Sequence, residues 1–231
     1  MAKVATYTSY DELANFSEDH QFHQQKASYL TQFMNVALKD EDWSVAFKAI
    51  DDLRITNKYH PAELAENIDY LAPLIKAAVD NLRSNISKNA LTLCNEIYAN
   101  KSMTGELKYA SQLKTFVRNT VPSLLQRTLA DKVFINKEAK EALSQCVTNL
   151  AVPETLEVLS NEGLRNKQNN MKLTELCYTM FLTAYCKAAP VEVTESTIML
   201  LQLLIEGIES VPRIKKVSVD MLKSLKVRIE E

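Results

Sequence analysis

The chain has 231 residues, of which 46% are hydrophobic and 24% are charged, and its formal net charge at pH 7 is −2. This composition is typical of a chain that buries a core and excludes general disorder, while the near-neutral charge excludes an overall attraction to nucleic acid. The three glycines are too few for β-sandwiches, barrels or nucleotide-binding α/β folds, whose turns and phosphate loops need positive φ.

Residues 1–24 are polar, contain scattered aromatic side chains and show no clear hydrophobic period. We therefore expect an N-terminal extension that packs on the rest of the chain or on a partner. The first residues contain no apolar region of the kind that marks a signal peptide, and the longest apolar run, residues 198–201, is too short to span a bilayer. We expect a protein of the reducing cytoplasm that does not associate with membranes.

From about residue 25 onward, apolar residues recur at the i, i+3, i+4 spacing of amphipathic helices, beginning with Leu30 and Met34. Asp42 is placed to cap the second helix, and Pro61 stands where it would open a third. The pattern predicts helices in pairs. The first helix of each pair is expected near residues 27–39, 62–79, 106–129, 153–162 and 191–208, and the second near residues 42–57, 85–99, 134–149, 166–187 and 211–229.

The second helices share a weak pattern, two small or apolar residues followed three positions later by another apolar residue. It begins at residues 49, 90, 142, 176 and 221, although any amphipathic helix can contain one such match by chance. A mean step of about 40 residues is typical of HEAT and armadillo repeats, in which neighbouring helix pairs stack and share a core. We therefore predict an all-α fold, a HEAT-repeat α-solenoid of about five helix pairs over residues 25–231.

Such a stack places the turns within the pairs along one edge, and four of the five predicted turns contain Lys or Arg at corresponding places. The first turn instead leads into Trp43, the only tryptophan of the chain. A line of cations steers an acidic protein partner, and tryptophan is enriched in binding hot spots. The alternative is that these cations are an ordinary solvated face and that Trp43 packs under the preceding helix.

Two segments resemble TOG domains. Residues 42–53 (DWSVAFKAIDDL) are similar to the first TOG repeat, and residues 79–90 (VDNLRSNISKNA) are similar to the second repeat of TOG domains of the CLASP and Crescerin type. The turns at residues 132–142 and 211–222 also fit, so the resemblance extends over about residues 27–229. The chain departs from many TOG domains in having five identifiable repeats rather than six, and in its N-terminal extension.

TOG domains bind αβ-tubulin through the turns within their repeats. The resemblance therefore implies αβ-tubulin or the microtubule lattice as the partner, other cytoskeletal proteins as further partners, and the cytoplasm and cytoskeleton as the location. The Crescerin-like second repeat adds the axoneme of a cilium or flagellum. The tubulin-contacting positions that the resemblance implies are Trp43, Arg83, Ser84, Lys88, Lys132, Lys137, Lys167, Arg213 and Lys216.

No pattern in the sequence predicts catalysis, a metal site or a cofactor. The four cysteines are not closely paired and fit buried thiols better than zinc ligands. His20 and His23 could share a helix face, but no further ligands accompany them. Asp51 and Asp52 are consecutive and do not face each other in a helix, so we interpret them as a solvated face. The competing hypothesis for function is a helical-repeat scaffold that binds a peptide or protein complex through its concave face.

Overall fold

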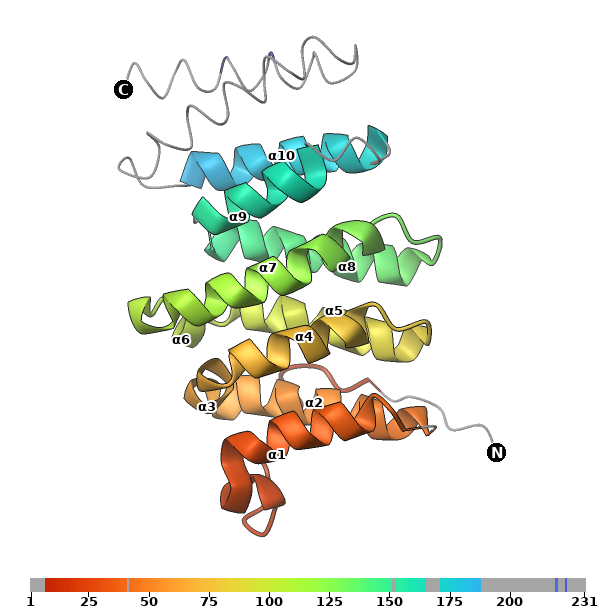
Figure 1. Ribbon diagram of the computed structural model, residues 1–231, viewed down its shortest axis with the longest axis vertical. Coiled ribbons are helices and arrows are strands. Elements are labelled where there is room, and N and C mark those ends of the chain that lie inside the picture. Colours follow the sequence, from red (N-terminus) through yellow and green to blue (C-terminus); the bar gives the residue numbers. More distant parts are fainter. Residues whose placement is uncertain are drawn as a thin grey trace. The chain divides into compact units, whose positions relative to one another are not determined.

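The computed structural model describes residues 7–40, 42–150, 153–164 and 171–187, together with Val219 and Lys223. All regular structure in these residues is helical, which confirms the predicted all-α class (Figure 1). The chain divides into two compact units, the first ending at Asn149 and the second beginning at Leu150. No helix among the described residues is both long and apolar enough to cross a membrane.

The helices of the first unit follow one another closely along the chain. They are α1 (Gln21–Ala37), α2 (Trp43–Tyr59), α3 (Pro61–Glu66), α4 (Ile68–Val79), α5 (Ser84–Ala99), α6 (Lys101–Thr104), the 3-10 turn η1 (Leu107–Tyr109), α7 (Ala110–Arg127) and α8 (Val133–Asn149). The second unit contains α9 (Pro153–Val158), the π-helical turn η2 (Leu159–Leu164) and α10 (Met171–Lys187), which pack on one another.

Most predicted helices lie close to the observed ones, and the differences have local causes. The helix expected over residues 62–79 is broken at Asn67, whose side-chain amide donates to the carbonyl of Glu63 at 2.7 Å and so ends α3. Helix α1 begins at Gln21, earlier than the expected residue 27, because the imidazole of His20 accepts from the amide of Phe22 and caps it. The helices expected over 191–208 and 211–229 lie outside the described residues, apart from Val219 and Lys223.

The long helices of the first unit form two layers. Helices α1, α4 and α7 pack side by side in one layer, and α2, α5 and α8 pack side by side in the other (Figure 1). Each helix of the first layer also packs on its chain neighbour in the second, so that α1–α2, α4–α5 and α7–α8 are three pairs. Fully buried apolar side chains fill the space between the layers, among them Ile50, Ile75, Leu93 and Phe116.

Three of the four cysteines belong to this kind of core. Cys94, Cys146 and Cys177 are buried and form no disulfide, as predicted. Burial raises the pKa of the Cys94 thiol far above its usual value and that of Cys177 to about 12. The side chain of Cys186 lies outside the described part of the chain, within which no group of three metal-ligating side chains occurs.

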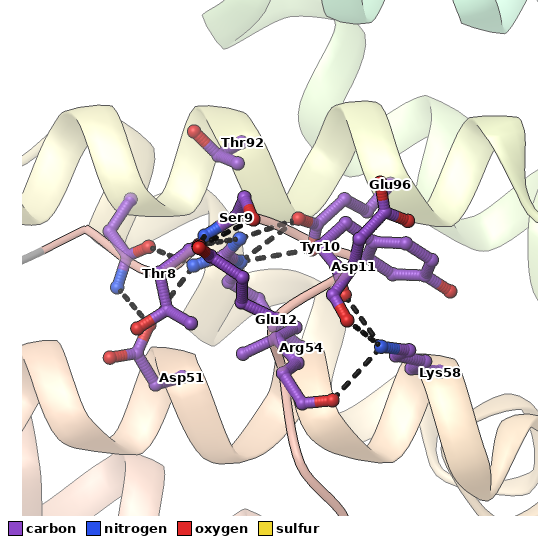
Figure 2. A network of polar contacts seen from close by, with 12 residues as sticks. Thr8, Ser9, Tyr10, Asp11, Glu12, Asp51, Arg54, Lys58, Thr92 and Glu96 are labelled. Atoms are coloured by element: carbon purple, nitrogen blue, oxygen red, sulfur yellow. Dashed lines mark hydrogen bonds and ion pairs between the residues drawn. The ribbon is translucent and has the colours of Figure 1, made fainter.

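A buried ion-pair network joins α2 to α5 (Figure 2). Arg54 is only 1% exposed, and its guanidinium donates to both carboxylate oxygens of Glu96, at 2.6 and 2.9 Å, and to Asp51 at 3.2 Å. Burial raises the pKa of the Glu96 carboxyl and Arg54 opposes this rise. The same region corrects the interpretation of Asp51 and Asp52, since Asp52 is buried and accepts from the hydroxyl of Tyr29 at 3.0 Å.

Arg54 should dominate the stability of the first unit. We expect Arg54→Met to lower the free energy of unfolding by about 3–5 kcal/mol, because it leaves the Glu96 carboxylate buried without a cation. Lys137→Met, which breaks the exposed pair with Glu141, should change it by less than about 1 kcal/mol. Urea unfolding followed by circular dichroism makes the comparison. A loss for Arg54→Met no larger than that for Lys137→Met would contradict this role.

Candidate functional site

The three turns within the pairs lie next to one another along one edge of the first unit, on the right-hand side of Figure 1. Their described residues are 38–40 with 42, 80–83 and 128–132. Trp43 from the first pair lines a pocket together with Arg83, Ser84 and Asn85 from the second. The ammonium group of Lys132 then donates to the hydroxyl of Ser84, which connects the second pair to the third.

The first turn sets the position of Trp43. Asp42 caps α2 by accepting from the amide of Ser44 at 3.0 Å, which makes Trp43 the first residue of the helix. The indole is half-buried and meets the ring of Phe47 edge-on, with the ring centres 6.1 Å apart. Phe47 in turn meets Tyr7 of the N-terminal segment edge-on at 5.2 Å. These three side chains form an aromatic row across the start of α2.

Three kinds of hydrogen bond hold the second turn in place: one within the turn, one between the flanking helices α4 and α5, and one from α7. Asn81 accepts from the amide of Arg83 at 2.8 Å, and Ser87 donates to the carbonyl of Val79 at 2.7 Å. The guanidinium of Arg127, at the end of α7, donates to the same carbonyl at 2.9 Å. With its main chain fixed in this way, the turn directs Leu82 into solvent, where its side chain is 96% exposed.

The pocket at the first two turns has a volume of about 360 Å³ and a mixed lining. Trp43 provides an aromatic wall, Arg83 a cation, and Ser84 and Asn85 polar groups. Lys88 lies beside this pocket with its ammonium group 4.2 Å from the ring centre of Tyr7. The Tyr7 hydroxyl donates to the carbonyl of Asn85. Burial is the largest cause that raises the pKa of this hydroxyl, and the nearby carboxylates of Glu138 and Asp51 raise it further. Such a lining suits an acidic side chain that approaches together with an apolar one.

The start of α8, directly after the third turn, adds exposed apolar side chains that were not among the predicted site residues. Val133 is 81% exposed and Phe134 is 43% exposed, immediately after Lys132. With Leu82, they place apolar surface between the cations of this edge. Their signal in the sequence is an apolar residue next to a cation at the boundary between a turn and a helix. However, the same pattern also occurs where a turn residue folds back into the core.

The structure gathers five of the nine predicted site residues. Trp43, Arg83 and Ser84 share the pocket, Lys132 reaches it through Ser84, and Lys88 lies beside it. Lys137 lies on α8, where it pairs with Glu141 at 3.7 Å. The remaining three, Lys167, Arg213 and Lys216, lie outside the described residues.

In comparisons with known proteins, the chain matches no protein-family model, and none of the curated proteins is significantly similar to it.

The exposed apolar residues should contribute little to folding. We expect Leu82→Asn and Val133→Asn each to change the free energy of unfolding by less than about 0.5 kcal/mol, because both side chains already lie in water. Ile86→Ala, at a buried position of α5, should cost about 2–5 kcal/mol. Urea unfolding provides the measurement. A loss above about 1 kcal/mol for Leu82→Asn would show that this residue serves the fold rather than a binding surface.

Proposed function

We propose that this chain is a non-enzymatic HEAT-repeat protein of the TOG type, which binds αβ-tubulin, free or in the microtubule lattice, through its edge of turns. The observation that carries the proposal is the pocket in which Trp43 meets Arg83 and Ser84 from the next helix pair. The axoneme of a cilium or flagellum, or another part of the cytoskeleton, is the proposed location.

The arrangement of the first unit supports a solenoid of the HEAT type. Three helix pairs repeat the same packing, with first helices against first helices and second against second. In such a stack each pair shares its apolar faces with its neighbours, and the turns recur at one edge. The pocket that Trp43 and Arg83 both line, and the hydrogen bond between Lys132 and Ser84, connect three turns that are far apart in the sequence.

The chemistry of the edge supports an acidic protein partner. Arg83 and Lys132 are exposed cations, and cations arranged in a line raise the association rate with an acidic surface and fix its orientation. The half-buried indole of Trp43 and the exposed Leu82 and Val133 offer apolar area that docking would remove from water. An edge that combines the two is better suited to a protein surface than to a phosphate backbone, which would favour cations alone.

The alternative scaffold function needs access to the layer of second helices. On α2 and α5 the N-terminal segment occupies this layer and its main chain accepts hydrogen bonds from Arg54 and Lys58, so a partner there would first have to displace the segment (Figure 2). The edge of turns, by contrast, exposes its cations and apolar residues to solvent. This difference favours the edge as the surface that meets tubulin.

Sedimentation with stabilised microtubules, and separately with free tubulin, tests the proposal. We expect the wild-type chain to bind at low salt and less tightly at moderate salt, because screening weakens attraction between exposed charges. Arg83→Glu/Lys132→Glu should weaken binding at least about tenfold, which corresponds to about 1.4 kcal/mol. Trp43→Ala should remove about 2 kcal/mol or more if the indole is an anchor.

Two control variants match these changes at exposed positions away from the turns. Lys108→Glu/Arg118→Glu makes the same change in charge on η1 and α7, and Tyr70→Ala removes an exposed ring from α4. Both should bind like the wild type. Absence of wild-type binding to either form of tubulin, or equal losses for the edge and control variants, would refute the proposal.

A further inference from the structure

The N-terminal segment, residues 7–13, lies along α2 and α5 and is held mainly through its main chain (Figure 2). The ammonium group of Lys58 donates to the carbonyls of Tyr10, Asp11 and Leu13, at 2.8, 2.9 and 2.9 Å. Two further donors on α2 reach this main chain, the guanidinium of Arg54 to the carbonyl of residue 8 at 2.8 Å and the hydroxyl of Tyr59 to that of Leu13 at 2.6 Å. Because every peptide has carbonyls, these donors provide affinity for a peptide main chain, while selection among sequences has to come from side-chain contacts.

The body of the protein holds the key donor in place without help from the segment. Glu96, Asp51 and Asn89 all accept from the guanidinium of Arg54, and all three belong to α2 or α5. The remaining N–H of Arg54 points to the segment. If the segment left, this charged group would lose an acceptor while staying fixed, so a replacement carbonyl would be favoured there. The site is therefore preorganised for a peptide.

The shape of the segment defines what the site accepts. Ser9 and Glu12 cap a single turn, with the Ser9 hydroxyl 2.6 Å from the Glu12 carboxylate. The carbonyls at the end of this turn converge on Lys58, as carbonyls at a helix C-terminus attract a cation. Side chains at every third position contact the body. The ring of Tyr7 lies against that of Phe47, the ring centre of Tyr10 lies 5.5 Å from the ammonium group of Lys58, and Leu13 is buried.

We propose that the face of α2 and α5 is a peptide-binding site and that residues 7–13 are its exchangeable resident ligand. The partner is a protein segment with two aromatic side chains three positions apart, a leucine three positions further, and one capped turn whose carbonyls meet Lys58. A resident ligand tethered to its own site has an effective concentration of the order of millimolar, so a partner peptide has to compete with it. The inference does not depend on tubulin binding.

The first test uses a synthetic peptide of residues 7–16 (YTSYDELANF) and the full chain, with titration calorimetry. Tyr7→Ala/Tyr10→Ala/Leu13→Ala disables the resident segment and leaves the site intact. The peptide should bind this variant at least ten times more tightly than it binds the wild type, whose site is occupied. A peptide with the same three alanines should bind neither. Failure to bind the folded variant, or equal binding to both proteins, would overturn the proposal.

Lysine substitutions on α2 separate a specific site from a general loss of charge. In the disabled background, Lys58→Met should reduce peptide binding at least tenfold, because three carbonyl contacts are lost. Lys48→Met, on the same helix and paired with Asp52, should leave binding unchanged. Equal losses for the two variants would contradict recognition by Lys58.

Hydrogen exchange on the wild-type chain tests exchangeability without any substitution. The amides of Glu12 and Leu13 donate within the resident turn, at 3.2 and 3.4 Å. If the segment leaves the site while the helices stay folded, these amides should exchange at least ten times faster than the central amides of α2. Protection equal to that of α2 would show that the segment is a fixed part of the fold and would overturn the proposal.

Discussion

The buried guanidinium of Arg54 must find acceptors for its N–H groups, and the first unit is arranged around this requirement. Glu96 and Asn89 on α5, together with Asp51 on α2, meet most of it. These contacts hold α2 and α5 at one relative position, because a shift along either helix would leave a charge buried without a partner. The start of α2, where Trp43 lies, is thereby kept beside the start of α5, where Arg83 lies. One interaction in the interior thus holds the pocket at the surface together.

The elements that the sequence predicted well are those with a local chemical signal. Asp42 caps α2 and Pro61 opens α3, as expected, because capping and proline chemistry depend on a few neighbouring residues. The break at Asn67 was not predictable, since an asparagine within an apolar period does not show whether its amide will bond to the preceding turn. Asp52 was misread for a related reason. Its partner, Tyr29, belongs to another helix, and sequence spacing does not reveal such a contact.

Only part of the candidate site could be predicted from the sequence. Cations and a tryptophan in successive turns form a recognisable pattern. In the structure Trp43, Arg83 and Ser84 line one pocket, and Lys132 donates to Ser84. The exposure of Leu82 had no comparable signal, because it follows from the way Arg127 and Asn81 fix the turn that contains it. Packing of the N-terminal extension on the chain was one of two expectations, but its place on α2 and α5 was hidden, since the main-chain carbonyls that bind there carry no information about sequence.

The aromatic row of Tyr7, Phe47 and Trp43 has a practical consequence. Its last member is the only tryptophan of the chain, so the ultraviolet emission of the protein comes mainly from one place. That place borders the pocket of the turns, and through Phe47 it also contacts the N-terminal segment. The colour and intensity of this emission therefore report events at both surfaces. The chain contains its own optical probe, and no dye has to be attached to follow either one.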